Sequence, residues 1–512
     1  MEYAIAVIDI GMTNKKVAIY DDALTQIDAR YRNFPPRMAD GLETHDLEAM
    51  EEWFIEELAK FARVYPVRAL AVTTHGATFV CVGKDGKPSA PCVYYTHEPG
   101  DEFQDRFYRL FGDPESLQER TGTPYLKALI NPAKGILFVK ENYPEQFGNT
   151  AHLLLYPQYW GYRFTGKTGA EGTYMGCHGY LWDQVEHKLS SVAEGLGVSA
   201  LMPGRIGNSW DVLGNITEEF ARKTGLARDV IVTMGIHDSN SSLLPHFAKR
   251  GETGFVLNST GTWCVIMNPV KAYGFTPDEL GKVVFFNISA FGGPIKTAIF
   301  QGGKEFETWS ALLMKLHNRK DIPSYDRELY WSVLAEKDAF LLPELVAGSG
   351  QFPGSKPRIA EAGAGAGAEY LYEDIVSGKV LPPSFRNYER GIALLRISLV
   401  MQTITALERT GVSLADEASG TADSPGEVFT EGGFRKDEAY NTLVSAFLKN
   451  QRVYLTDIAE ATALGAAMTA KMALTGKSLT DLARDFDIDY QEVAKSGIPE
   501  IFSYREAWLS RI

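Results

Sequence analysis

The chain alternates short apolar runs with longer segments in which apolar residues recur at helical spacing. Apolar and β-branched runs predict strands at 4–10, 17–20, 69–74, 78–82, 230–234, 254–257 and 263–267. Helical spacing predicts helices at 48–64, 132–141, 157–164, 239–247 and 458–468. Strands that alternate with helices in this way predict an α/β protein.

The first two predicted strands enclose a polar turn. It contains Gly11, which lets a ligand approach the backbone, the donors Thr13 and Asn14, and the cation Lys16. Asp9 ends the preceding strand, and a carboxylate beside phosphate donors is favourable only with a cation such as Mg²⁺ between them. The turn is therefore a candidate phosphate site. Because such turns are common, the alternative is a surface hairpin that binds no ligand.

A second strand pair, at 254–257 and 263–267, encloses a turn without lysine. Thr260 and Thr262 place hydroxyls around Gly261, and backbone N–H groups there can form an anion-binding nest. The same residue types are also ordinary turn formers, so this motif too is open to a structural interpretation.

The segment Gly-Ile-His-Asp-Ser at 235–239 joins a strand to a helix. Asp238 is our candidate for a general base, and the helix dipole would keep it ionised. The alternative is a helix N-cap, a role that aspartate commonly has. His237 is predicted to donate to a substrate hydroxyl or to orient Asp238, with simple packing as its alternative.

Together with Glu-Gly-Gly-Phe-Arg at 431–435, these segments are similar in order and spacing to the sugar kinases of the FGGY family, over about residues 3–475. Gly-x-His-Asp followed by Thr-Gly-Thr-Trp most resembles the L-fuculose and L-rhamnulose kinases. The resemblance implies a two-domain actin/hexokinase-type (ribonuclease H-like) ATPase fold with an interdomain cleft. The domains implied are 1–248, with the sugar site, first phosphate hairpin and base, and 249–512, with the nucleotide site and second hairpin.

The resemblance also implies roles for individual residues. Sugar contacts are expected from His75, Gly76, Tyr95, Glu171, His237 and Asp238, the last as catalytic base. Nucleotide contacts are expected from Gly11, Thr13, Asn14, Lys16, Thr260, Gly261, Thr262, Gly302, Gly303, Gly432, Gly433 and Phe434. Metal contacts are expected from Asp9 and Asp238. Phe434 either stacks on adenine or fills a helix–sheet interface, and we favour the latter.

Two segments depart from the pattern of the most similar kinases. Gly-Ala-Thr stands at 76–78 where they usually have Gly-Val-Asp, and Tyr-Thr-His-Glu-Pro stands at 95–99 where they have aromatic-x-(Asp or Cys)-x-Arg. These changes leave the identity of the sugar open.

Composition agrees with such a protein. The 512 residues include 45% hydrophobic and 23% charged residues, as in ordinary soluble globular proteins, and the length suits two domains. A net charge of −14 argues against nucleic acid or an anionic membrane as partner. The four cysteines are scattered without metal-type spacing, which favours reduced thiols and a cytoplasmic protein.

Composition also predicts the character of four further segments. The N-terminus enters a strand directly, so no signal peptide is expected. The apolar run 392–407 contains Arg396 and Gln402 and is predicted to be a buried helix. Small or polar residues predict surface loops at 360–368 and 414–426.

The sequence therefore predicts ATP-dependent phosphorylation of a ketose resembling L-fuculose at a terminal hydroxyl, with ATP and Mg²⁺. Rhamnulose, xylulose, ribulose and erythritol are alternative acceptors. A non-catalytic sugar or nucleotide sensor is the alternative of another class, and a chaperone or filament ATPase is a third. Homodimerisation is left open.

Overall fold

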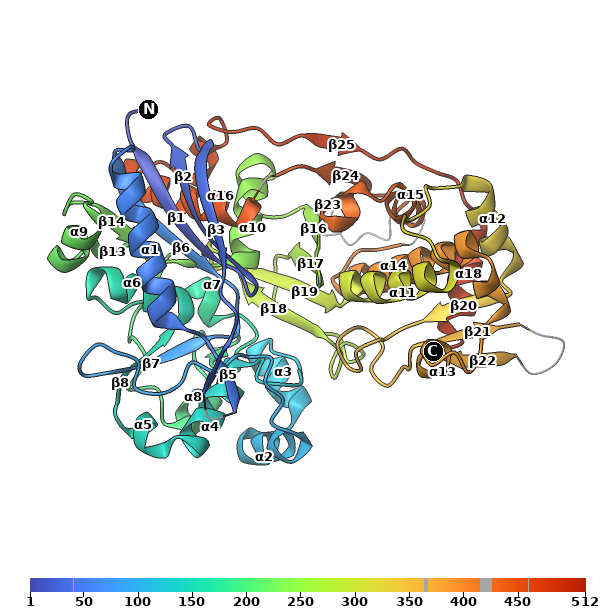
Figure 1. The fold of residues 1–512 in the computed structure, drawn as a ribbon, viewed down its shortest axis with the longest axis horizontal. Helices are drawn as coiled ribbons and strands as arrows, with labels where there is room; N and C mark the ends of the chain where they lie inside the picture. The colour runs from blue at the N-terminus through green and yellow to red at the C-terminus, as the bar shows by residue number, and fades with distance from the viewer. Residues whose placement is uncertain (40, 363–366, 415–425, 459) are drawn as a thin grey trace.

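The fold consists of two halves, each built on a mixed β-sheet (Figure 1). The computed structural model describes residues 1–512 except 40, 363–366, 415–425 and 459. In Figure 1 the N-terminal half lies on the left and most of the C-terminal half on the right.

The N-terminal sheet has seven strands. They are β1 (Ala4–Ile10), β2 (Asn14–Asp21), β3 (Gln26–Asn33), β6 (Val67–Thr74), β13 (Val212–Asn215), β14 (Ile231–Thr233) and β15 (Ile236–His237). Their order is β13-β14-β6-β1-β2-β3, with β15 also paired to β6. Strands β1, β2 and β3 are antiparallel neighbours, whereas β6 runs parallel to β1 and β14.

The C-terminal sheet also has seven strands. They are β16 (Phe255–Thr260), β17 (Cys264–Pro269), β18 (Val284–Ile288), β19 (Pro294–Phe300), β23 (Glu427–Gly432), β24 (Arg452–Thr456) and β25 (Tyr490–Glu492). The hairpin β16-β17 has β19 antiparallel on one side and β23 and β24 parallel on the other. This repeats the arrangement of β1, β2, β3, β6 and β14, so each half carries one glycine hairpin at the same place in its sheet.

Helices and short strands surround the two sheets. The helices of the N-terminal half are α1 (Leu47–Ala62), α2 (Asp101–Phe111), α3 (Pro114–Thr121), α4 (Pro132–Asn142), α5 (Pro144–Gly148), α6 (Tyr156–Thr165), α7 (Gly172–Met175), α8 (Ser191–Leu196), α9 (Glu218–Thr224) and α10 (Asp238–Arg250). Those that follow are α11 (Gly302–His317), α12 (Arg327–Glu336), α13 (Tyr372–Val376), α14 (Tyr388–Arg409), α15 (Glu438–Phe447), α16 (Ala461–Thr475), α17 (Leu479–Leu482) and α18 (Glu500–Leu509), with 3₁₀ turns at Pro383–Arg386 and Gly433–Lys436. The short strands are β4 (Arg37–Ala39), β5 (Leu42–Thr44), β7 (Phe79–Gly83), β8 (Thr150–Leu155), β9 (Ala170–Glu171), β10 (Trp182–Asp183), β11 (Lys188–Leu189), β12 (Ile206–Gly207), β20 (Ala339–Leu342), β21 (Arg358–Glu361) and β22 (Ala368–Leu371).

Helices α10 and α16 join the two halves through a shared apolar core. This core combines residues of the first sheet such as Ile5 and Val7, residues of the second such as Leu257, and the inner faces of both helices. The helices cross at Gly465, where an added Cβ would stand 1.9 Å from the carbonyl oxygen of Ser241. Although α16 is late in the sequence, it packs beside the first sheet (Figure 1).

The alternation of β1 assigns each residue to one face of the sheet. Ala6, Ile8 and Ile10 belong to the core of the N-terminal half, whereas Ile5 and Val7 face α10 and α16. Asp9 continues the face of Ile5 and Val7, so the strand directs its carboxylate toward α16 between the halves.

Most predicted elements are present. The expected strand 4–10 is β1, and the helices expected at 48–64, 132–141 and 157–164 are α1, α4 and α6 within two residues at each end. The loop predicted at 360–368 is wrong at its edges: Ala360 is fully buried in β21 and Ala368 begins β22, because β20 supplies an apolar partner strand. Residues 363–366 of that segment, and 415–425 of the other predicted loop, lie outside the described residues.

By length and composition, one helix in the described part of the chain is apolar enough to cross a membrane. It is α14, and 94% of its most apolar window is buried inside the protein. The helix predicted at 392–407 is thus a core helix of the C-terminal half, packed beside α11 (Figure 1).

Candidate functional site

Asp238 is the first residue of α10 and faces a cavity between the two halves. The cavity has a volume of about 390 Å³, and residues of the second half such as Gly432 and Thr462 line it with Asp238. Asp238 Oδ1 accepts hydrogen bonds from the backbone N of Ser239 at 2.6 Å and its Oγ at 3.2 Å. Burial raises the pKa of Asp238 to about 6, although these bonds favour the ionised form.

His237 is buried next to Asp238 and is neutral. Burial lowers its pKa to about 3. Its Nδ1 lies 3.2 Å from Asn240 Nδ2, and its Nε2 lies 3.3 Å from Asp238 Oδ1. With the Asn240 amide as donor to Nδ1, the ring proton is on Nε2, which lies 3.4 Å from Cys177 Sγ and makes its hydrogen bond there.

Glu171 holds the backbone of His237 in place through Thr173. Its side chain is fully buried and accepts bonds from Thr173 N, Thr173 Oγ1, Tyr174 N and Ser209 Oγ at 2.7–3.1 Å. Burial raises its pKa to about 7. Thr173 Oγ1 in turn accepts from the backbone N of His237 at 3.0 Å. Glu171 therefore caps α7 and holds the turn that carries His237, while its predicted direct contact with sugar stays a prediction.

Three residues of the N-terminal half lie near Asp238: His75, Gly76 and Tyr95. His75 Nδ1 donates to the carbonyl of Gly76 at 2.8 Å, which leaves Nε2 as a buried acceptor without a protein partner among the described residues. Burial lowers the pKa of His75 to about 3. Tyr95 lies 5.5 Å from the His75 ring, and burial with the nearby charge of Asp238 raises the phenol pKa to about 12. An acceptor and a phenol here could hydrogen-bond two hydroxyls of a polyol.

Asp9 and Lys16 face each other across the first hairpin. The register pairs them, and Lys16 Nζ lies 3.6 Å from Asp9 Oδ2. Lys16 also contacts Glu460 at 2.5 Å, and Thr462 Oγ1 donates to Asp9 Oδ2 at 2.8 Å. Burial raises the pKa of Asp9, and the nearby charge of Asp238 adds to the effect. Sequence reasoning missed Glu460 and Thr462, because the contact joins residues about 450 positions apart.

Lys15 was also missed. Unlike the exposed Thr13 and Asn14 at the hairpin tip, its side chain is fully buried, and Nζ donates to the carbonyl of Met12 at 2.8 Å. Burial lowers its pKa to about 8, and its charge helps keep His75 neutral. An alternating strand sends Lys15 and Lys16 to opposite faces, a signal that was present in the sequence.

The second hairpin and the glycine turns of the C-terminal half border a larger cavity. It has a volume of about 660 Å³ and adjoins the Asp238 cavity at Lys436. Predicted nucleotide residues that line it are Thr260, Gly261, Thr262, Gly303, Gly433 and Phe434. Phe434 is 7% exposed and packs its ring 4.9 Å from Tyr440, so most of it fills the interface with α15.

The glycines of this region allow backbone segments to touch. An added Cβ on Gly303 would stand 2.0 Å from the carbonyl of Gly261, and one on Gly432 would stand 2.0 Å from the carbonyl of Thr260. Gly302 packs instead on Cys264 and Phe300, below the cavity wall. The predicted nucleotide residues of the C-terminal half therefore lie close together, with Gly302 packed behind them.

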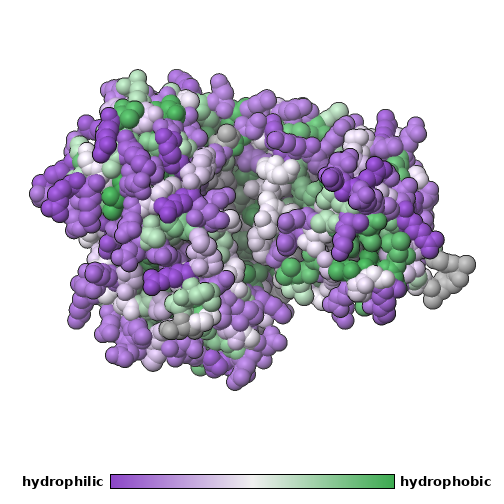
Figure 2. Space-filling model, in the orientation of Figure 1, coloured by the Kyte–Doolittle hydropathy of each residue, from purple (hydrophilic) through white to green (hydrophobic). Residues whose placement is uncertain are grey.

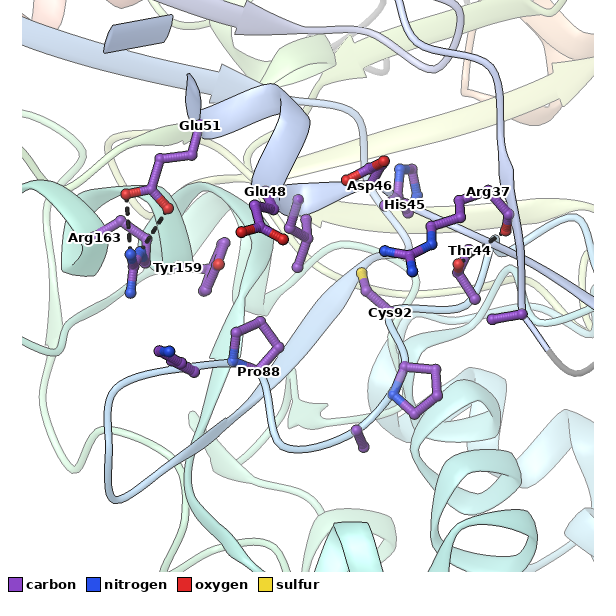
Figure 3. Close-up of a pocket in the computed structure, with 15 residues that line it drawn as sticks. Arg37, Thr44, His45, Asp46, Glu48, Glu51, Pro88, Cys92, Tyr159 and Arg163 are labelled. Atoms are coloured by element: carbon purple, nitrogen blue, oxygen red, sulfur yellow. Dashed lines mark hydrogen bonds and ion pairs between the residues drawn. The ribbon is translucent and has the colours of Figure 1, made fainter. Parts of the chain in front are cut away.

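Figure 2 shows this face of the molecule hollowed between the two halves, with apolar residues in the hollow and polar residues around it. A separate pocket of about 420 Å³ lies beside β4, β5 and the start of α1 (Figure 3). There Arg163 pairs with Glu51 at 2.9 Å, and His45 stacks 4.0 Å from Tyr94. The His45 ring also lies 5.6 Å from the ring of His75, so this pocket is next to one of the predicted sugar-binding residues.

Two sheets of one topology, each with a glycine hairpin beside a shared cleft, define a two-domain fold of the actin/hexokinase type. Solved structures agree with this class of fold. A carbohydrate kinase from Novosphingobium aromaticivorans aligns with a TM-score of 0.77 at 24% identity, covering 100% of this chain and 98% of that one. A ligand-bound xylulose kinase from Lactobacillus acidophilus aligns with a TM-score of 0.78 at 16% identity, covering 99% and 96%. The predicted fold class is confirmed.

The family follows from the sequence match. The N-terminal domain of the FGGY family of carbohydrate kinases matches residues 4–245, and the FGGY C-terminal domain matches residues 252–372. This chain belongs to the FGGY family of carbohydrate kinases. A rhamnulokinase of Yersinia pestis is 25% identical over 231 residues, which is 44% of this chain and 45% of that relative. The match thus spans less than half of the curated relative.

Proposed function

We propose that this protein transfers the γ-phosphoryl group of ATP to a terminal hydroxyl of a ketose resembling L-fuculose. The observation that carries the proposal is the position of Asp238. Its carboxylate has a raised pKa and lines a cavity between the halves that adjoins the hairpin and glycine turns of the nucleotide side. A chaperone-type or filament ATPase needs no such base beside polyol-binding groups.

The residues take complementary roles in this reaction. Asp238 accepts the proton of the attacking hydroxyl, and the backbone N–H and Oγ–H of Ser239 hold the carboxylate in place. His75 Nε2 accepts from a sugar hydroxyl, since it is a buried acceptor without another partner in the described chain. Lys16 and the backbone N–H group of Thr262 balance the negative charge of the phosphates. Positioning supplies most of the catalysis in phosphoryl transfer.

The residues present fit Mg²⁺. Asp9 and Asp238 offer carboxylate oxygens at one end of the cleft, and the pKa of Asp9 is raised by burial and further by the charge of Asp238. Bound there, Mg²⁺ would neutralise phosphate charge in the transferring group.

The substrate class is tested by ADP release with matched sugars. We expect turnover of at least one ketose with L-fuculose-like or L-ribulose-like stereochemistry, and a preference for each ketose over its aldose. Thr78 stands where the most similar kinases have aspartate, and it is buried, so selectivity is expected to be broad or redirected. Turnover of aldoses or glycerol alone would contradict the ketose assignment, and ATP binding without turnover of any sugar would favour a sensor.

The rate should depend on pH through Asp238. Its pKa is raised to about 6, so the carboxylate takes up a proton and stops acting as a base as the pH falls through that value. We expect kcat at saturating substrates to fall about tenfold per pH unit below about pH 6. His237, with its lowered pKa, stays neutral across this range. A profile that stays flat down to about pH 4, the usual carboxyl range, would contradict this assignment.

Lys16→Ala should slow turnover more than it weakens sugar binding, because phosphate charge grows toward the transition state. We expect kcat to fall about 10²-fold with the sugar Kd, measured by calorimetry, little changed. Glu460→Gln is the matched control: it removes the partner of Lys16 but keeps the lysine charge, so its loss of kcat should be smaller. Lost sugar affinity with normal turnover would contradict a phosphate role for Lys16.

A further inference from the structure

Three side chains that can bind a metal ion come together in the N-terminal half, next to Gly76. Cys177, His178 and His237 each offer one ligand atom, and these atoms lie within 4.8 Å of one another. Cys177 and His178 follow α7, whereas His237 ends β15, so two distant segments build the cluster.

The distances suit a tetrahedral metal ion. Cys177 Sγ lies 3.4 Å from His237 Nε2. Zn²⁺ bonds of ~2.3 Å to sulfur and ~2.0 Å to nitrogen separate two tetrahedral ligands by roughly 3.5 Å. The observed separation is therefore close to that of ligands already placed around zinc.

Gly76 keeps the space between the two histidines open. An added Cβ on this glycine would stand 2.9 Å from His178 Nε2 and 3.0 Å from His237 Nε2. Both nitrogens thus face one point above a residue without a side chain, as two ligands of one ion would.

The buried amide of Asn240 supplies the outer partner that a metal-bound histidine needs. Asn240 is 1% exposed, and its Oδ1 has no hydrogen-bond partner among the described residues. Rotating the amide by half a turn would bring Oδ1 to His237 Nδ1, which then donates a proton. That tautomer frees the lone pair of His237 Nε2 for a metal.

We propose that Cys177, His178 and His237 bind Zn²⁺, and that zinc bound there inhibits the kinase. The inhibitory part rests on the proposed function. Binding replaces the S–H bond of Cys177 by an S–Zn bond and releases the proton to water. It also occupies His237 Nε2, and Asp238 Oδ1, 3.3 Å from that nitrogen, is within reach of the fourth ligand position. A carboxylate bound to zinc is a weaker base, so the proposed base loses activity.

Cobalt tests the site without using activity. Co²⁺ added to the reduced full-length protein, in a phosphine reductant that does not bind the metal, should give thiolate-to-cobalt charge-transfer absorption and intense tetrahedral bands. Zinc should remove these bands by displacement. Cys177→Ser should abolish the charge-transfer absorption, whereas Cys81→Ser, which changes a buried thiol in β7, should retain it. Absence of the bands from the wild type, or their persistence in Cys177→Ser, would overturn the site.

A second variant tests the site even if Cys177→Ser does not fold. His178→Asn keeps a residue type that tolerates the positive φ of 21° at this position. Circular dichroism establishes folding, and zinc retained after dialysis is measured by mass spectrometry. We expect zinc affinity to fall at least about tenfold, since loss of even an outer-shell partner costs ~10–100-fold. Affinity equal to that of the wild type would exclude His178 from the site.

Inhibition is measured as the ratio of rates with and without zinc, within each variant and at fixed Mg²⁺ and ATP. The zinc concentration for half inhibition should rise at least about tenfold in His178→Asn and stay unchanged in Cys81→Ser. Equal inhibition of all variants would overturn the inhibitory part. If no sugar is phosphorylated, the proposed function is wrong, but the cobalt spectra still show whether the three residues bind a metal ion.

Discussion

Asp238→Asn is expected to keep sugar binding and to lower kcat by ~10²–10⁴-fold, the usual effect of removing a positioned general base. The amide has nearly the size of the carboxylate and can still accept from Ser239, so α10 should begin at the same place. The variant loses the ability to take a proton from the attacking hydroxyl. Steady-state kinetics give kcat, and calorimetry gives the sugar Kd.

Ser242→Ala is the matched control for this substitution. Ser242 lies one turn further along α10, lines the same cavity, and its Oγ donates to the carbonyl of Ser239. Its loss should change kcat far less than Asp238→Asn. Activity of Asp238→Asn within about tenfold of the wild type would remove Asp238 from the role of base.

Gly465→Ala is expected to separate α16 from α10. The new Cβ would stand 1.9 Å from the carbonyl oxygen of Ser241, and backbone cannot move aside as a flexible side chain can. Overpacking of this kind costs about 1–3 kcal/mol, which lowers the apparent Tm by roughly 1–3 °C in a chain of this size. Because Thr462 on α16 bonds Asp9, kcat should fall as well.

Gly148→Ala is the control for an added methyl group. Gly148 ends α5, and an added Cβ there would meet nothing within 4 Å. Scanning calorimetry should give this variant a Tm equal to or above that of the wild type, since alanine favours helix more than glycine does. An unchanged Tm in Gly465→Ala would mean that the helices do not pack as closely as described.

The strands and both hairpins were predictable because their signals are local. Strand β1 coincides with the expected 4–10, since a mostly apolar, β-branched run before a glycine turn strongly favours a strand. In the turn 235–239, a glycine followed by Asp-Ser predicted the start of a helix. The structure gives Gly235 a φ of 88° and begins α10 at Asp238.

Contacts between distant segments could not be predicted. The bond from Lys16 to Glu460 depends on α16 crossing into the N-terminal half, which no local pattern encodes. Glu171 looks like a cleft carboxylate in sequence, yet the neighbouring Thr173 and Tyr174 donate three hydrogen bonds to it and the distant Ser209 donates a fourth. The meeting of Cys177 with His237 was missed for the same reason, because their spacing of 60 residues matches no metal motif.

Phosphorus NMR of the reaction products tests the central claim most directly. The protein, ATP, Mg²⁺ and the best ketose of the panel should yield ADP and one new phosphomonoester signal. That signal should be a triplet, split by the two hydrogens of a terminal carbon, and Asp238→Asn should not produce it. Release of inorganic phosphate alone, or an ester signal of equal rate with Asp238→Asn, would contradict phosphoryl transfer to a terminal hydroxyl with Asp238 as the base.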